Sequence, residues 1–250
     1  MRKARAAKRL AAAAVGLTWL ALLAGCDGSQ PPTQGGLASM PPSLILAEAR
    51  AAAETAGSVH YVQTGRTSQE TGMNVADAAA SKGHDAMTLS NGARATVIVT
   101  GGVAYLRANL VALTGFFLLP GTTATRMANR WISVRSSISA DRQLWDDLSF
   151  EMTTGSILGA LTPVGPLTRT PAGRVGGRLV VGVHGKVRPG TGAAPGSTET
   201  LYVAASGLPL PVSCTEVYDS SKVITAFSRW GEAVQITAPP GATPLPAASP

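Results

Sequence analysis

The chain has 250 residues, a formal net charge of +7 and an aromatic content of only 5%. Five of its 21 Lys and Arg residues lie within the first nine positions, and the remaining 16 nearly balance the 14 acidic residues. The basic excess therefore does not indicate a nucleic-acid partner, and we expect none. The length is sufficient for one large domain with its own hydrophobic core.

Residues 1–25 have the three zones of a secretory signal peptide. The basic residues of the first nine positions precede an uncharged apolar run over residues 10–24, and small residues precede Cys26. The apolar run of about 15 residues is shorter than the roughly 20 that a helix needs to cross a bilayer. This layout predicts a segment that is removed from the mature protein.

The tetrad Leu23-Ala24-Gly25-Cys26 resembles the lipobox of bacterial lipoproteins. In that family a diacylglyceryl group is attached to the cysteine sulfur, and a peptidase cuts before the modified residue. The resemblance implies lipidation of Cys26 by acyl chains such as palmitate, which provide a stable anchor. We therefore expect the protein on the extracytoplasmic (periplasmic) face of the cell membrane; the alternative is a soluble secreted protein with a chance cysteine.

Both flanks of the predicted domain are rich in proline. Residues 26–42 contain two Pro-Pro pairs together with Gly, Ser and Thr, and residues 239–250 contain five prolines. Such compositions bury too little apolar surface to order themselves. We predict a flexible linker over 26–42, one domain over 43–238 and a disordered tail over 239–250. If Cys26 is lipidated, Cys214 has no disulfide partner and is expected to be a buried thiol.

A helix is predicted from Ser43 to Gly57, with small alanines on the face toward a sheet. Alternating patterns then predict a strand over 59–65, one or two strands over 75–89, and a hairpin over 93–106. Apolar segments broken by Gly and Pro, at 110–119, 139–148 and 157–161, predict short helices, with one strand at 131–134 between them. Further strands are expected at 178–187, 200–204, 212–218, 223–230 and 233–237. This order predicts an α+β fold with an antiparallel sheet packed on helices.

From these elements the chain resembles the mycobacterial LppX/LprG lipoproteins, relatives of the LolA-like half-barrel proteins. The matching features are residues 23–26, the Ala-rich first helix leading into 58–61, the hairpin at 101–106, and residues 129–132, 201–203, 207–212 and 227–231. Apart from residues 23–26, these features extend over residues 44–238. The bias toward Ala, Arg and Gly is typical of a GC-rich genome and indicates an actinobacterial source. The resemblance depends on the order of the elements and not on any single motif.

The resemblance implies a strongly curved antiparallel sheet, a LolA-like half-barrel, wrapped over a few helices. It also implies an apolar cavity that binds acyl chains of a lipid or lipoglycan, for transfer or presentation across the cell envelope, with an envelope transporter as a further partner. We expect the cavity to be lined by Val97, Val99, Phe116, Phe117, Leu118, Leu119, Leu144, Trp145, Leu148, Ile157, Leu158 and Leu161. Periodicity alone does not distinguish such a lining from a filled core.

Motifs of catalysis are absent from the sequence. His60, His84 and His184 are scattered without the spacing of a zinc site, and no Gly-x-Ser-x-Gly occurs. We therefore expect no enzymatic activity, no metal and no cofactor. Two functions remain: a membrane-tethered lipid-binding protein, or a non-carrier envelope sensor or accessory module with a filled core.

Overall fold

The computed structural model describes residues 36–66, 70–139, 141–190, 196–218 and 221–245. The predicted signal peptide, Cys26 and most of the predicted linker lie outside the described residues. The described part starts with a 3₁₀ turn, η1 (Leu37–Ser39), and the helix α2 (Pro42–Ala56), which lead into the first strands. The expected helix therefore begins one residue earlier than predicted, because Pro42 occupies its first position.

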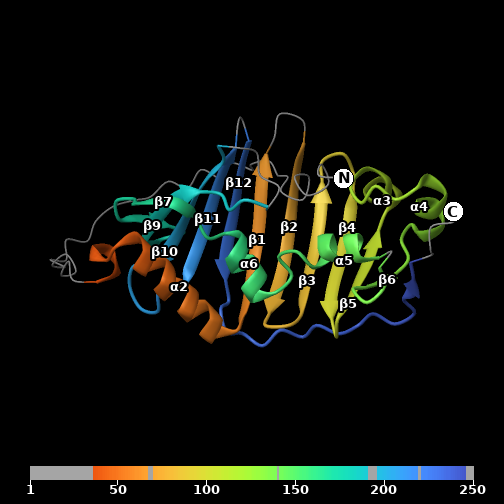
Figure 1. Ribbon diagram of the computed structural model, residues 1–250, viewed down its shortest axis with the longest axis horizontal. Helices are drawn as coiled ribbons and strands as arrows, with labels where there is room; N and C mark the ends of the chain where they lie inside the picture. Colours follow the sequence, from red (N-terminus) through yellow and green to blue (C-terminus); the bar gives the residue numbers. More distant parts are fainter. Residues whose placement is uncertain (1–35, 67–69, 140, 191–195, 219–220, 246–250) are drawn as a thin grey trace, which may run out of the picture.

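One open sheet contains all the strands of the described residues (Figure 1). Its order is β13-β6-β5-β4-β3-β2-β1-β12-β11-β10-β9-β7, with β8 paired to β9. Every strand pair in it is antiparallel except the one between β13 and β6. The strands are β1 (Ser58–Arg66), β2 (Thr71–Ala79), β3 (Gly83–Leu89), β4 (Arg94–Thr100), β5 (Val103–Ala108), β6 (Ile132–Arg135), β7 (Val164–Arg169), β8 (Gly173–Val175), β9 (Arg178–Lys186), β10 (Thr198–Ala204), β11 (Pro211–Tyr218), β12 (Ser221–Ser228) and β13 (Thr243–Pro244).

The helices α2, α5 and α6 cover one face of this sheet, and α3 and α4 lie at its β4–β6 end (Figure 1). The helix α2 contacts α6 and the strands β1, β7 and β9, whereas α5 contacts β4, β5 and β6. The helices after α2 are α3 (Leu110–Gly115), α4 (Gly121–Met127), α5 (Arg142–Ser149) and α6 (Thr154–Ala160). The short helices expected in the middle of the chain are thus present and separate two groups of strands.

The sequence of α2 explains how closely it packs on the sheet. Gly57 ends the helix in a left-handed conformation, φ 73°, and its N–H donates to the carbonyl of Ala53. The buried face consists of Ile45, Leu46, Ala49 and Ala53, whose small alanines allow a close approach. Leu44, the residue before Ile45, is 53% exposed and lies outside this face.

The buried side chains of the described residues form two separate hydrophobic cores. The first core joins β3, β4, β5 and β6 to α3, α4 and α5, and it includes Leu106, Leu113, Ile132 and Leu148. The second core joins β1, β2 and β9–β12 to α2 and α6, and it includes Ile45, Tyr61, Ile157 and Phe227. The boundary between the two cores follows β2 and β3, so the middle of the covered face contains no continuous core.

After β12, which lies inside the sheet, the chain runs along one end of the strands to the edge formed by β6 (Figure 1). There β13 pairs with β6, and the backbone N–H groups of Thr243 and Leu245 donate to the carbonyls of Trp131 and Ser133. The first part of the predicted disordered tail therefore belongs to the sheet, and residues 246–250 lie outside the described residues. The strand expected at 233–237 is absent, and α5 begins at Arg142 rather than near Ser139.

Candidate functional site

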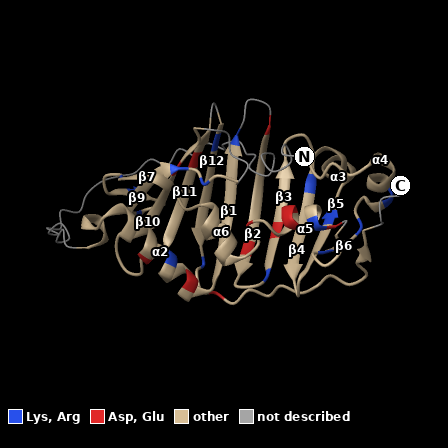
Figure 2. Cartoon of the chain, in the orientation of Figure 1, with Lys and Arg blue, Asp and Glu red and all other residues tan. Residues whose placement is uncertain are grey.

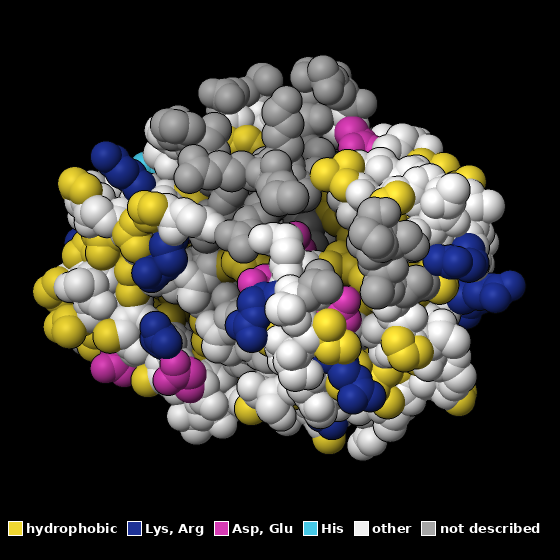
Figure 3. All heavy atoms as spheres, turned by 45° about the vertical axis from the view of Figure 1, so that its right-hand side comes forward, with side chains coloured by type: hydrophobic (Ala, Val, Ile, Leu, Met, Phe, Trp, Pro, Cys, Tyr) yellow, Lys and Arg dark blue, Asp and Glu magenta, His cyan; other side chains and the backbone are white. Residues whose placement is uncertain are grey.

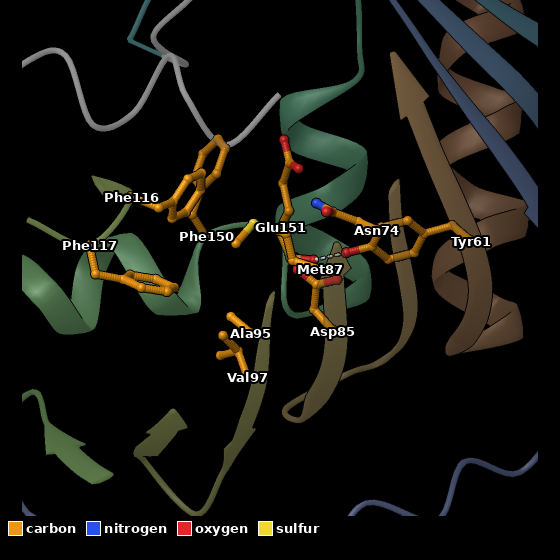
Figure 4. Close-up of a pocket in the computed structure, with 10 residues that line it drawn as sticks. All are labelled: Tyr61, Asn74, Asp85, Met87, Ala95, Val97, Phe116, Phe117, Phe150 and Glu151. Atoms are coloured by element: carbon orange, nitrogen blue, oxygen red, sulfur yellow. Dashed lines mark hydrogen bonds between the residues drawn. The ribbon is translucent and has the colours of Figure 1, made fainter. Parts of the chain in front are cut away.

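A cavity lies between the two cores, on the helix-covered face of the sheet (Figure 4). It contains about 450 Å³ of empty space, its open mouth included. Only a small part of this space is wide enough for a water molecule. Its walls come from β1–β4, from the end of α3 and from the connection between α5 and α6.

The apolar wall consists of three aromatic rings above the side chains of two strands. Phe116 and Phe117 follow α3, and their ring centroids are 5.0 Å apart in an edge-to-face arrangement with an interplanar angle of 77°. Phe150 comes from the end of α5, and Met87, Ala95 and Val97 come from β3 and β4. Alternation along β4 directs Ala95 and Val97 to the helix-covered face, where both are buried.

The other wall is polar and comes from β1, β2 and β3. Residues opposite one another in an antiparallel sheet share a face, and the register aligns Tyr61 with Ala76 and Ala76 with Asp85. Asn74 lies opposite Met87 in the neighbouring row. The Asn74 Oδ1 atom is shielded from solvent and accepts no hydrogen bond from the described residues. An acceptor thus points into the cavity from the middle of the sheet.

Tyr61 is the best-fixed residue of the polar wall. Its hydroxyl donates to the backbone carbonyl of Glu151 at 2.9 Å, and its side chain is 3% exposed. Burial, and then the nearby carboxylates of Asp85, Glu151 and Asp77, raise the pKa of the Tyr61 hydroxyl well above its ordinary value. The ring is therefore a neutral hydrogen-bond donor at physiological pH.

Glu151 reaches the cavity from a tightly held connection between α5 and α6. Its backbone is left-handed, φ 61°, a conformation that is unfavourable for a glutamate, and the residue is buried. The connection continues into α6 through a capping box between Thr153 and Ser156. The Thr154 hydroxyl donates to the carbonyl of Gly57 at 3.1 Å, which ties α6 to the start of β1.

A glycine on β3 allows this connection to lie against the sheet. A Cβ atom added to Gly83 would overlap the carbonyl oxygen of Met152, the residue after Glu151. Ala79 at the end of β2 also forms a parallel bridge with Thr153. Direct backbone contact with β2 and β3 therefore fixes the position of Phe150 and Glu151 over the cavity.

The sequence assigned twelve residues to the cavity. Three of them line it, namely Val97, Phe116 and Phe117. Val99 and Leu148 are buried in the first core, with Leu119, Leu144 and Trp145 packed against it. Ile157 and Leu161 belong to the second core, and Leu158 is buried. Leu118 differs most from the expectation, because its side chain is 58% exposed.

The sequence reasoning did not select the polar wall or three of the apolar lining residues. The residues that it missed are Tyr61, Asn74, Asp85, Met87, Ala95, Phe150 and Glu151. Alternation places Asp85 and Met87 on one face of β3, so this signal was present in the sequence. Phe150 and Glu151 lie in a helix connection, where no periodicity indicates direction.

Three further features of the described residues concern metal ions, thiols and the membrane. Within them, no group of three or more His, Cys, Asp or Glu side chains could bind a metal ion. Cys214 forms no disulfide with a described residue, its thiol donates to the carbonyl of Leu161 at 3.9 Å, and it is 1% exposed. No helix in the described ranges is long and apolar enough to cross a membrane.

Solved structures show where this fold occurs. LprF from Mycobacterium bovis is 20% identical, with a TM-score of 0.50, and the match covers 80% of this chain and 97% of that chain. LppX, a lipoprotein from Mycobacterium tuberculosis, is 16% identical, with a TM-score of 0.48 and coverage of 78% and 99%. A conserved protein from Thermus thermophilus is 11% identical, with a TM-score of 0.43 and coverage of 81% and 96%.

The likeness to LprF confirms the predicted fold, an α+β half-barrel of the kind expected from the LppX/LprG resemblance. No protein-family model matches the chain, and the search of curated proteins found no match. The fold is thus established by structural similarity, at an identity too low to transfer a ligand.

Proposed function

Taking the LppX/LprG-type half-barrel fold as the premise, we propose that this chain is an envelope lipoprotein that binds acyl chains in the cavity between its two cores. It then transfers or presents the bound lipid or lipoglycan across the cell envelope, without catalysis. Its signal peptide is residues 1–25, its lipidation site is Cys26, and residues 26–42 link the anchor to the domain. It is held on the extracytoplasmic face of the cell membrane, where an envelope transporter is its further partner.

The observation that carries this proposal is the position of the cavity. The space of about 450 Å³ includes the open mouth, and the part wide enough for a water molecule is far smaller than the roughly 300–1,000 Å³ of typical ligand sites, so the cavity must widen to admit an acyl chain. Three phenylalanine rings form much of its apolar wall. A water molecule finds few hydrogen-bonding partners beside Phe116, Phe117 and Val97, whereas an acyl chain loses none there. The apolar wall therefore favours a hydrocarbon ligand.

The polar wall favours an amphiphile over a pure hydrocarbon. Asn74 and Asp85 provide acceptor oxygens, and the Tyr61 hydroxyl and Glu151 lie beside them (Figure 4). A head group with a hydroxyl donor, such as a sugar or a glycerol, satisfies the Asn74 Oδ1 acceptor. The acyl chain then extends from this end toward Phe116 and Phe117.

Entry of an acyl chain requires the walls to separate, because much of the space is thinner than a water molecule. Phe116 and Phe117 pack in or against the first core, whereas Phe150 and Tyr61 pack in or against the second. These two groups can therefore move apart without opening either core. Phe116 and Phe117 follow α3, a six-residue helix whose main contacts are α4 and β4. A shift of α3 widens the cavity while the sheet stays intact.

The lipid contacts that we propose begin with Val97, Phe116 and Phe117, which line the cavity. The other predicted residues of the first core, among them Leu119, Leu144 and Trp145, become contacts where the cavity widens toward α5. Trp145 Nε1 is shielded from solvent and has no hydrogen-bond acceptor among the described residues. It is therefore a second polar atom available to a ligand.

Native mass spectrometry of the full chain extracted from membranes tests this function. We expect a copurifying lipid in addition to the mass of the protein and its N-terminal modification. In the variant Ala95→Leu the added side chain fills the cavity, and we expect the lipid to be lost. The matched control is Thr96→Leu, the next residue of β4, whose side chain lies on the opposite face of the sheet and should leave the lipid bound.

A wild-type protein that repeatedly yields only its own mass contradicts the proposal. The filled-core module would then be the better description, and Ala95→Leu should destabilise the fold by about 1–3 kcal/mol through overpacking. Urea unfolding of both variants separates the two cases, because a cavity accepts the additional methyl groups with little loss of stability.

A further inference from the structure

The β4–β6 end of the molecule has an unusual charge distribution. Residues 86–140 contain five arginines and no acidic residue, whereas all 14 acidic residues lie elsewhere in the chain. This stretch of sequence forms β4, β5, α3, α4 and β6, and Figure 2 shows its basic residues on β4 and β5 together with the acidic residues of α5, which packs on the same strands. All five arginine side chains are exposed, and none forms an ion pair with another described residue. They are Arg94, Arg107, Arg126, Arg130 and Arg135.

The same end exposes aliphatic side chains on a short segment. Leu110 and Val111 open α3 and are 43% and 44% exposed, and Leu118 follows the helix at 58%. Three exposed aliphatic residues therefore occur within nine positions. Leu44 and Leu208 occur singly on separate elements, whereas the strand register places the exposed Met73, Ile224 and Val217 near one another on β2, β12 and β11. A grouped set of this kind indicates an interaction surface.

The backbone at Leu118 makes this exposure costly. Its φ is 54°, in the left-handed region that leucine rarely adopts. Hydrogen bonds on both sides hold the turn, from the N–H of Phe117 to Ala112 and from the N–H of Leu119 to Leu113, both 2.9 Å. The chain thus places a leucine in solvent through an unfavourable conformation, as is typical of functional segments.

This segment adjoins the cavity. Phe116 and Phe117 line the cavity, and Leu118 is the next residue of the chain. In Figure 3, which brings this end of the molecule forward, hydrophobic side chains gather around the centre of the view, with acidic side chains among them. A binding partner that contacts Leu118 therefore lies one residue away from the wall of the cavity.

We propose that α3 and residues 116–120, together with Arg126 and Arg130, form a docking surface for an anionic lipid bilayer. Leu110, Val111 and Leu118 enter the interfacial region, and the exposed arginines contact the lipid phosphates. Five cations without a single anion match a negatively charged surface, and flexible aliphatic side chains suit acyl chains. Asp85 and Glu151 line the cavity together with Phe116 and Phe117, and further acidic residues lie on α5, which packs on β4–β6.

This docking goes beyond the proposed function, because it assigns a contact with a second bilayer and holds whether or not the cavity contains a lipid. Vesicle capture tests it. The full chain is inserted through its N-terminal segment into phosphatidylcholine vesicles, which are then mixed with labelled acceptor vesicles. We expect capture of acceptors made of equimolar phosphatidylglycerol and phosphatidylcholine, weak capture of pure phosphatidylcholine, and loss of capture at high salt.

Matched variants locate the surface. Leu118→Asn removes the exposed leucine and supplies a residue that tolerates the left-handed backbone, so the fold should be preserved while capture falls roughly tenfold. The control is Leu208→Asn, which removes a leucine that is 71% exposed in the turn between β10 and β11. The double variant Arg126→Gln with Arg130→Gln should lower capture roughly tenfold or more. Arg178→Gln, an exposed arginine on β9, should leave it unchanged.

Equal capture of neutral and anionic vesicles, or unchanged capture by Leu118→Asn, overturns the docking proposal. Capture that requires protein-bearing acceptor membranes overturns it too and indicates a protein partner for this surface. Lipid copurification, measured on the same preparations, reports separately on the cavity. A clean protein mass with intact vesicle capture contradicts only the proposed function.

Discussion

At the scale of single residues, Tyr61 connects the cavity to the stability of the fold. Its hydroxyl donates to Glu151, and its ring packs near Phe227 at a centroid distance of 6.4 Å. The hydrogen bond joins the sheet to the α5–α6 connection, so Tyr61 fixes the polar wall. The sequence places Tyr61 on an alternating strand, but it gives no indication that the residue's partner is a carbonyl 90 residues later.

The raised pKa of Tyr61 predicts a dependence of stability on pH. Ionisation is easier in the unfolded chain, so the contribution of Tyr61 is fully present below its ordinary pKa of about 10 and is lost as pH rises toward the folded value. Urea unfolding at increasing alkaline pH should show a falling free energy of unfolding. In Tyr61→Phe this decline should be shallower, and at neutral pH the variant should be about 1 kcal/mol less stable. An identical decline in both proteins would show that Tyr61 is not buried in this way.

At the scale of elements, the α5–α6 connection determines the shape of the cavity. It lies against β3 because Gly83 has no side chain, and α6 is fixed by its cap and by Thr154. The sequence predicted the short helices on either side. It did not predict their close approach to the sheet, because a glycine in a strand has several possible roles.

Gly83→Ala should therefore displace this connection. The new methyl group meets backbone rather than a movable side chain, and we expect a loss of about 2 kcal/mol or more in the free energy of unfolding. Gly155→Ala is the matched control, because no atom lies near its added Cβ and alanine favours the helix α6. It should be neutral or stabilising by up to about 1 kcal/mol. Comparable losses in both variants would contradict the close contact at Gly83.

At the scale of the whole molecule, two cores share one open sheet, and the last described residues complete its edge. The cavity exists because helices pack on each half of the sheet without meeting in the middle. The strand β13 covers the exposed edge of β6, and Leu245 packs against the first core. Composition had suggested a disordered tail here, since such a segment buries little apolar surface of its own; pairing with β6 overrode that preference at Thr243 and Leu245.

Ending the chain before Thr243 should destabilise the β4–β6 end. The deletion removes two backbone hydrogen bonds and the contact of Leu245, for which we expect about 2–3 kcal/mol in the free energy of unfolding. A chain that ends after Leu245 is the control and isolates the contribution of residues 243–245. Equal stability of the two truncated chains would show that β13 contributes nothing to the fold.

The sequence by itself determined the class of fold. Alternation in β4, β5 and β9, the small residues of α2 and the Gly and Pro breaks in the middle are local signals, and they indicated an antiparallel sheet packed on short helices. They also marked Val97, Phe116 and Phe117 as apolar positions, whereas the expectation that these residues line a cavity came from the resemblance to the LppX/LprG lipoproteins. Periodicity reports which face of an element is apolar, so this much is available without the tertiary structure.

Only the tertiary structure decided which apolar side chains fill a core and which surround a space. Leu148 and Ile157 were expected to line the cavity, but each is buried in one of the two cores. Leu118 was expected there too, but its left-handed backbone turns it outward. The polar wall of Asn74, Asp85 and Glu151 depends on strand register and on a connection distant in sequence. Register and long-range packing arise from the sum of many contacts, and no local pattern of residues encodes that sum.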